Sequence, residues 1–278
     1  MTLFYIVLAS LAGGLVSASL AALLAWRLAP RLIPLFVSFA VGALLGVVFL
    51  DLLPHIFERA AESHDTAAWI LAGILAFFVL EKLVLWRHNH DHAGQAEAAI
   101  AGHAHLHDGN HSHPHGHAHD TVSVEQSGRA SSAWMIIVGD AFHNFTDGFA
   151  IAAAFMADTR LGIVTAIAIV AHELPQELGD FLVLLHSGFS KARALFWNLV
   201  SSLATLIGAL IAYFAMQSFE QYTPVFLCFA ASSMIYVAIA DLIPGLHKKT
   251  ALSDSLLQIL LIGLGVGSIA LFRLLMAH

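Results

Sequence analysis

The chain has 278 residues and is far more apolar than an ordinary soluble domain. Hydrophobic residues make up 59% of it, charged residues only 11%, and the mean hydropathy is +0.79. The formal net charge is -7, and the sequence has no clustered basic surface of the kind that binds nucleic acid. A single cysteine, Cys228, excludes an internal disulfide and a thiolate metal cluster. These properties indicate a chain that lies in a lipid bilayer and has no nucleic-acid partner.

Apolar runs follow one another along the sequence. A spanning helix needs about 20 predominantly apolar residues. Eight runs have this length, over residues 3–26, 35–54, 67–86, 133–156, 161–186, 195–216, 223–246 and 254–276. The first run has no basic segment before it, so we expect it to be retained rather than cleaved as a signal peptide. We therefore predict an all-α membrane protein in which residues 1–278 form one polytopic domain of eight transmembrane helices.

The basic residues indicate the orientation of these runs, because Lys and Arg gather in the short loops on the cytoplasmic side of a membrane. Nine of the twelve lie beside the loops that follow runs one, three, five and seven. The opposite side holds only Arg59, Arg160 and Arg273, among several carboxylates. We therefore predict a multi-pass protein of the plasma (inner) membrane with both termini outside.

A histidine-rich segment, residues 87–131, joins the third and fourth runs. It contains eleven histidines: His88, His90, His92, His103, His105, His107, His111, His113, His115, His117 and His119. Its His-x-His spacing among Gly, Ala and Asp cannot form a packed core, so we predict a disordered cytoplasmic loop. Because neutral imidazole binds zinc, copper, nickel and iron, auxiliary metal binding is expected there. A solvated spacer is the alternative.

Polar residues interrupt the fourth and fifth runs. The fourth carries four of them at i, i+3, i+4 and i+7: Asp140, His143, Asn144 and Asp147. The fifth carries a second stripe: His172, Glu173, Gln176, Glu177 and Asp180. An ionisable residue within a span costs roughly 3 kcal/mol on insertion scales, so each is a candidate functional residue. Since each stripe occupies one helix face, we expect the two stripes to face each other or a water-filled path.

The residue types suit a transition metal. His143 with Asp147, and His172 with Gln176, are i, i+4 pairs that can each place two ligand atoms around one ion. Nitrogen and oxygen donors without thiolate favour zinc, iron or manganese over Cu(I). A buried hydrogen-bond network that joins two helices is the structural alternative.

Further residues extend this predicted site. Asn144 and Glu173 lie one position along and are candidates for a neighbouring ion, with Asp147 bridging the two ions. Pro175 removes the helical hydrogen bond to the carbonyl of Ala171, which predicts a kink beside the ligands.

The HELPQ sequence that begins at His172 also resembles part of HExxH, the helical zinc motif of metalloproteases. Gln176 replaces the second histidine of that motif, and Pro175 interrupts the turn. A membrane-embedded metalloprotease is therefore a distant alternative.

Two short segments near opposite ends of the chain resemble each other. Run two ends in a DLLP sequence that begins at Asp51, and run seven ends in a DLIP sequence that begins at Asp241. The predicted orientation makes these two runs antiparallel, which is typical of inverted repeats with a site near the midplane. We therefore predict that runs 1–3 and 6–8 form two halves around runs 4–5. We expect Asp51, Asp140, Asp180 and Asp241 to line the transport pathway.

Taken together, these features resemble the ZIP (Zrt/Irt-like) family of metal transporters, in the branch with a His-rich cytosolic loop. Eight runs, outward termini, the histidine loop, HNFTDG at His143 and HELPQELGD at His172 carry the resemblance. It implies a binuclear metal centre on the fourth and fifth spans and metal movement into the cytoplasm. It implies no covalent chemistry, so no enzyme is expected.

The resemblance also implies roles for individual residues. One metal position takes His143, Asp147, His172 and Gln176. Its neighbour takes Asn144, Asp147, Glu173 and Gln176. Glu177 would be an adjacent ligand or a proton acceptor. Two departures stand out, because related members often have histidine where Gln176 stands, and because residues 41–48 of the second span offer no side-chain donor.

We therefore predict zinc uptake into the cytoplasm by an elevator-like or rocking motion of spans four and five. Zn²⁺ is the expected substrate rather than a cofactor, with Fe²⁺, Mn²⁺ and Cd²⁺ as alternative substrates. A proton-coupled metal exporter, which would use the same residue types, is the other transport hypothesis. The oligomeric state is left open between a monomer and a homodimer.

Overall fold

The computed structural model of the chain describes residues 1–25, 32–59, 65–83, 120–247 and 251–276, and of residues 59, 120–132 and 220 it describes the backbone only. In these ranges all regular structure is helical. Seven helices are long and apolar enough to cross a membrane: Thr2–Ala25, Ile33–Glu58, Asp65–Leu83, Thr159–His186, Lys191–Ser218, Thr223–Leu246 and Leu252–Leu275. The prediction of an all-α chain with many membrane-spanning helices is therefore confirmed.

Several of these spans are composite. The first consists of α1 (Thr2–Leu11), a π-helical segment η1 (Ala12–Val16) and α2 (Ser17–Ala25). The second consists of α3 (Ile33–Val47), the π-helical η3 (Val48–Leu52) and α4 (Leu53–Arg59). The seventh consists of α9 (Thr223–Tyr236), the π-helical η5 (Val237–Leu242) and α10 (Ile243–Leu246). Continuous helices form α7 (Thr159–His186), α8 (Lys191–Ser218) and α11 (Leu252–Leu275), and a short 3₁₀ turn, η4 (Glu220–Tyr222), follows α8.

The fourth predicted span, 133–156, lies inside the longer helix α6 (Asp120–Ala157). This helix is not among the seven membrane-spanning candidates, because its polar residues lower its mean hydropathy. It also begins inside the segment 87–131 that the sequence predicts to be a loop. No proline interrupts the chain from Asp120 to Ala157, so the helix can extend beyond the apolar run.

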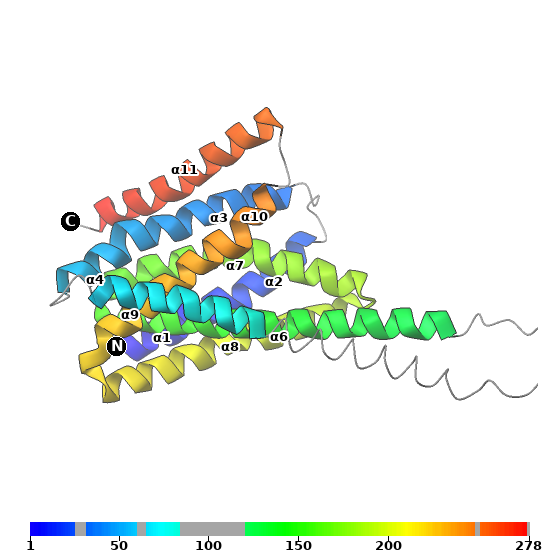
Figure 1. The fold of residues 1–278 in the computed structure, drawn as a ribbon, viewed down its shortest axis with the longest axis horizontal. Coiled ribbons are helices and arrows are strands. Elements are labelled where there is room, and N and C mark those ends of the chain that lie inside the picture. Colours follow the sequence, from blue (N-terminus) through cyan, green and yellow to red (C-terminus); the bar gives the residue numbers. More distant parts are fainter. Residues whose placement is uncertain (26–31, 60–64, 84–119, 248–250, 277–278) are drawn as a thin grey trace, which may run out of the picture.

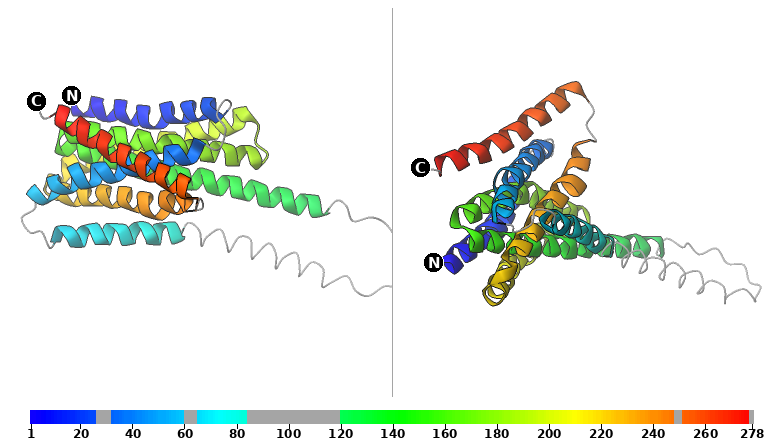
Figure 2. Two further views of the ribbon diagram at one scale, coloured as in Figure 1. Left: turned by 90° about the horizontal axis from the view of Figure 1, so that it is seen from above. Right: turned by 60° about the vertical axis from the view of Figure 1, so that its left-hand side comes forward.

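Helices α6 and α7 contact both predicted halves of the chain. Helix α6 packs against α1, α8 and α9, and α7 packs against α2, α3 and α8 (Figure 1). Helix α11 packs mainly against α3 and forms one outer edge of the bundle (Figures 1 and 2). The start of α1 and the end of α11 lie at the same end of the bundle (Figure 2). Spans four and five therefore contact both predicted halves, and the halves also meet each other directly where α3 packs against α11.

The two related segments, DLLP and DLIP, have the same local structure. In each, a π-helical segment ends at the leucine after the aspartate, and an α-helix resumes before the proline. The two segments run in opposite directions in Figure 1. This match supports the prediction of an inverted repeat.

The second span continues beyond Pro54, where the predicted run ends. Proline has no N–H, so the carbonyl of Leu50, four residues earlier, loses its helical partner. The side chain of Arg273 supplies a replacement, because its Nη1 donates a hydrogen bond of 2.7 Å to that carbonyl. The widened turn of η3 precedes the proline, so the helix passes through it and ends at Arg59.

Helices α6 and α8 approach each other until their backbones touch. A Cβ atom at Gly148 would lie 1.8 Å from the carbonyl oxygen of Thr205, and one at Gly208 would lie 2.0 Å from that of Phe145. No side chain fits at either position. Small residues at helix interfaces allow such close packing in membranes, so these two glycines fix the distance between α6 and α8.

We predict that Gly148→Ala destabilises the protein, because the added methyl group would collide with the backbone of α8. The melting temperature of the purified protein in detergent should fall by several degrees. Gly139→Ala is a matched control on the same helix, because a Cβ there meets nothing within 4 Å. That control should melt at or slightly above the wild-type temperature, since alanine favours helix over glycine. Equal effects of the two substitutions would contradict the packing described.

Candidate metal centre

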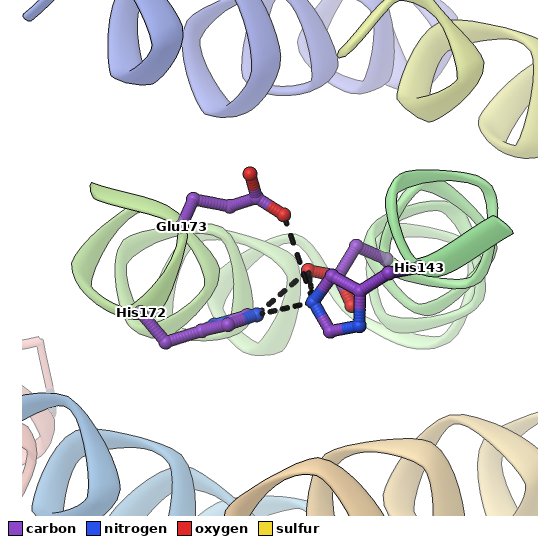
Figure 3. A group of neighbouring side chains, drawn as sticks. His143, His172 and Glu173 are labelled. Atoms are coloured by element: carbon purple, nitrogen blue, oxygen red, sulfur yellow. Dashed lines mark hydrogen bonds and ion pairs between the residues drawn. The ribbon is translucent and has the colours of Figure 1, made fainter. Parts of the chain in front are cut away.

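Four side chains from α6 and α7 converge between these helices. His143 and Asp147 come from α6, and His172 and Glu173 come from α7; one ligand atom from each lies within 4.8 Å of all the others. We call this group the four-residue cluster. Figure 3 shows His143 pointing across the gap toward His172 and Glu173. His172, Glu173 and Asp147 are almost fully buried, whereas the His143 side chain is 13% exposed.

The distances within the four-residue cluster suit a zinc ion. The Nε2 atom of His172 lies 2.9 Å from Asp147 Oδ2 and 3.1 Å from His143 Nε2. His143 Nε2 lies 3.6 Å from Asp147 Oδ2 and 3.8 Å from Glu173 Oε1. Tetrahedral zinc with bonds of about 2.1 Å separates its ligand atoms by roughly 3.4 Å. The observed separations lie on both sides of this value, so small side-chain movements are enough to surround one ion.

A hydrogen bond orients the central imidazole. His172 Nδ1 lies 3.2 Å from the carbonyl oxygen of Ala168, one turn earlier on α7, and a carbonyl can only accept. With the proton on Nδ1, the Nε2 atom carries a lone pair directed at the cluster. Such a backbone bond to the second nitrogen is the usual support of a metal-binding histidine. The converging atoms are therefore electron-rich and suit a cation.

Buried carboxylate oxygens around the cluster lack ordinary partners. Neither oxygen of Glu173 has a hydrogen-bond partner among the described residues, and the same holds for Oε2 of Glu177 and Oδ2 of Asp140. An unpartnered buried polar group costs free energy comparable to a lost hydrogen bond. A bound cation would compensate this cost.

The structure places Asn144 beside the cluster in a network of its own. Its amide nitrogen donates to the carbonyl oxygen and to Oδ1 of Asp140, at 3.1 and 2.9 Å. Its amide oxygen accepts a hydrogen bond of 2.8 Å from the hydroxyl of Thr205 on α8. Asn144 is therefore held on both sides by protein groups.

Glu177 and Gln176 follow the cluster residues on α7, and Glu177 bonds to α8. Glu177 Oε1 is 2.7 Å from the hydroxyl of Ser202, which also lies 2.7 Å from the carbonyl of Asn198, so one proton serves two acceptors. Gln176 Oε1 is buried without a hydrogen-bond partner among the described residues. The resemblance implied that Glu173 serves the neighbouring position, whereas here it lies with His143, Asp147 and His172.

A cavity of about 310 Å³ leads from the site toward one end of the bundle. It reaches the most accessible ligand, His143, and Gln176 beside it. Carboxylates from four elements line it: Glu81, Asp140, Asp180 and Asp241. The pathway residues predicted on spans four, five and seven therefore share one cavity, together with Glu81, which the sequence analysis did not select.

On the other side of the cluster the core is apolar. Ile151 on α6 and Ile169 on α7 lie one turn from the ligands and are fully buried. They belong to a single hydrophobic cluster with Val48 and Leu52 of the second span. Beyond these residues along α6 and α7 lies a second cavity of about 200 Å³, which Asp158 and Leu161 help to line.

Asp51, the fourth predicted pathway residue, lines this second cavity. Its Oδ1 atom is 3.6 Å from Nε of Arg273 on α11. Arg160, at the start of α7, donates to the backbone carbonyl of Arg273. Asp51 therefore lies in a polar network that joins the second, fifth and eighth spans, far from the four-residue cluster.

The sequence analysis missed the contribution of α8. Asn198 and Ser202 donate hydrogen bonds to Glu177, and Thr205 donates one to Asn144. Four polar residues share this face of the helix: Asn198, Ser201, Ser202 and Thr205. They stand at i, i+3, i+4 and i+7, which is the same spacing that identified the stripes of spans four and five. Serine and threonine are common in membrane helices, which hid this signal. The predicted auxiliary histidines, from His88 to His119, lie outside the described residues.

A protein-family model and several known proteins match this chain. The model of the family described as ZIP zinc transporter matches residues 1–273. The Zinc transporter ZIP13 homolog of Drosophila melanogaster is 31% identical over 275 residues, which cover 87% of this chain and 78% of the relative. Zinc transporter zipt-7.2 of Caenorhabditis elegans is 37% identical over 257 residues, which cover 83% of this chain and 56% of the relative.

A third relative matches only part of the chain. Zinc transporter ZIP10 of Danio rerio is 40% identical over 142 residues, which cover 49% of this chain and 17% of the relative. The chain thus spans most of the first relative, little more than half of the second and a small part of the third.

We predict that zinc raises the melting temperature of the purified protein, because a ligand that binds only the folded state stabilises it, by about 2.7 kcal/mol at a concentration of 100 Kd. His172→Ala and Asp147→Asn should lose most of this shift, since each removes a donor or its charge from the four-residue cluster. His186→Ala, at the exposed end of the same helix α7, should retain it. A full zinc shift in the His172→Ala protein would contradict the assigned cluster.

Proposed function

We propose, from the premise that the chain belongs to the ZIP zinc transporter family, that it carries Zn²⁺ across a membrane into the cytoplasm through the four-residue cluster. This family consists of membrane transporters and not enzymes, so the metalloprotease alternative is set aside. The observation that carries the proposal is a buried set of nitrogen and oxygen donors that opens into a carboxylate-lined cavity on one side and faces apolar side chains of the described residues on the other.

The cavity supports a release path. His143 is the most accessible member of the four-residue cluster and also lines the cavity. An ion that leaves the cluster at this side meets Gln176 and then the carboxylates of Asp140, Asp180 and Asp241. Clustered negative charge in a low-dielectric wall attracts a divalent cation. By the charge distribution of the loops, this end of the bundle faces the cytoplasm, which favours uptake.

A second metal position is part of the proposal. Asn144, Glu173 and Gln176 would supply it, and Asp147 would bridge the two ions. The unpartnered oxygens of Glu173 and Gln176 support this assignment, because both are available to a second ion. Neutral amides from Asn144 and Gln176 bind more weakly than carboxylates, so this ion would be released more readily.

Alternating access requires the apolar layer to open. We assign this step to an elevator-like or rocking motion of spans four and five against the repeat halves. The motion would separate Ile151 and Ile169 from Val48 and Leu52. It would expose the cluster to the second cavity, which Asp51 lines and which would face the outside. Asp51 would then be the first carboxylate that an incoming ion meets.

The direction of transport distinguishes uptake from the exporter alternative. Both would use buried histidines and carboxylates, and both fit a multi-pass protein. We propose the plasma membrane, with both termini outside, and the shared end of α1 and α11 agrees with termini on one side (Figure 2). Zinc is the proposed substrate in preference to Fe²⁺, Mn²⁺ or Cd²⁺.

We predict that cells expressing the wild-type chain accumulate radioactive zinc from the medium, and that His172→Ala abolishes this uptake at equal surface expression. Deletion of residues 88–119 should change the rate by a few fold at most, because the transport cluster lies outside that segment. Faster loss of a preloaded zinc pool, in place of uptake, would favour the exporter.

A second test concerns the orientation of the carboxylate-lined cavity. In a Cys228→Ala background, which removes the single native cysteine, Asp241→Cys should react with a membrane-impermeant thiol reagent. The reaction is expected in inside-out vesicles and not in intact cells. Labelling in intact cells alone would reverse the proposed orientation.

A further inference from the structure

The hydroxyl of Thr205 on α8 has an unusual hydrogen-bond partner for a hydroxyl in a helix. Most helical hydroxyls bond to a carbonyl one turn back, as Ser38 and Ser218 do here. Thr205 instead donates across the helix interface to the amide oxygen of Asn144 on α6, at 2.8 Å. Both residues are fully buried or nearly so, with exposed fractions of 1% and 0%, so water cannot replace this bond.

Together with two further hydrogen bonds, this bond fixes the orientation of the Asn144 amide. The amide nitrogen already has two acceptors on Asp140, its carbonyl oxygen and Oδ1. An amide flipped by 180° would face two acceptors with its oxygen and a donor with its nitrogen, so the flipped state is disfavoured. An amide oxygen has two lone pairs, and Thr205 occupies one. The other remains available to an ion.

The backbone contact between α6 and α8 sets this geometry. Gly148 stands one turn beyond Asn144, and its missing Cβ allows the carbonyl of Thr205 to lie against α6. The Thr205 hydroxyl is thereby held within reach of Asn144. Thr205 thus joins the amide of Asn144 on α6 to helix α8.

We propose that Thr205 is a positioning residue for the second metal position: its hydroxyl holds the Asn144 amide so that the remaining lone pair is directed at the ion. This inference rests on the proposed function, since it assigns Asn144 to a transported ion. It places one determinant of substrate affinity on span six, which supplies none of the proposed ligands.

The test uses zinc uptake by the full chain with Thr205→Val and Thr205→Ser. Valine has nearly the shape of threonine but no hydroxyl, whereas serine keeps the hydroxyl. Loss of one buried hydrogen bond corresponds to about a five- to tenfold change, so Thr205→Val should raise the KM for zinc by that factor. The maximal rate per surface-expressed molecule should change less than twofold, and Thr205→Ser should restore the wild-type KM. A merely structural role would instead lower expression or maximal rate and leave the KM unchanged.

A double-mutant cycle with Asn144→Ala gives the decisive result. If Thr205 acts through Asn144, Thr205→Val should raise the KM no further in the Asn144→Ala protein. Additive effects, or an unchanged KM in Thr205→Val alone, would overturn the inference. The wild-type chain and the His172→Ala variant are measured in the same assay. They distinguish a failure of the proposed function from a failure of the role assigned to Thr205. A wild type that moves no zinc counts against the proposed function, whereas a transporting wild type with an unaltered Thr205→Val KM counts only against the role of Thr205.

Discussion

The cost of burying charge in a membrane protein is the constraint on which the rest of this structure depends. Asp147, His172 and Glu173 are almost completely withdrawn from solvent, and the oxygens of Glu173 have no hydrogen-bond partner among the described residues. Such groups are stable only if they pair with one another or with a cation. Because the donors come from two adjacent helices, a passing metal ion can satisfy them together. The cost of burial therefore favours the binding of a cation at these four side chains.

The surrounding helices keep these donors in place without becoming ligands. Helix α8 lies against α6 at Gly148 and Gly208, and its hydroxyls reach Asn144 and Glu177. On the opposite side, α3 and its π-helical continuation contribute apolar side chains to the hydrophobic cluster that also contains Ile151 and Ile169. The bundle therefore places polar groups on one side of the cluster and apolar groups on the other. This asymmetry is what the proposed alternating access would use.

Much of this arrangement could be predicted from the sequence because hydrophobic periodicity and charge placement are strong signals in membrane proteins. The spans, the stripes around His143 and His172 and the repeated DLxP segments are visible as patterns. Other features depend on three-dimensional packing. The continuation of span two through Pro54 requires Arg273, distant in sequence, to bond to the Leu50 carbonyl. The supporting role of Thr205 likewise depends on a backbone contact that sequence spacing alone does not reveal.

The central claim is that His143, Asp147, His172 and Glu173 together hold the transported ion. Anomalous X-ray diffraction at the zinc absorption edge, on crystals of the full chain grown with zinc, tests it most directly. We expect an anomalous peak between α6 and α7, about 2.0–2.2 Å from ligand atoms of these four side chains. A second peak next to Asn144 and Gln176 would extend the account to two ions. Zinc peaks confined to other parts of the chain, with none between these two helices, would contradict it.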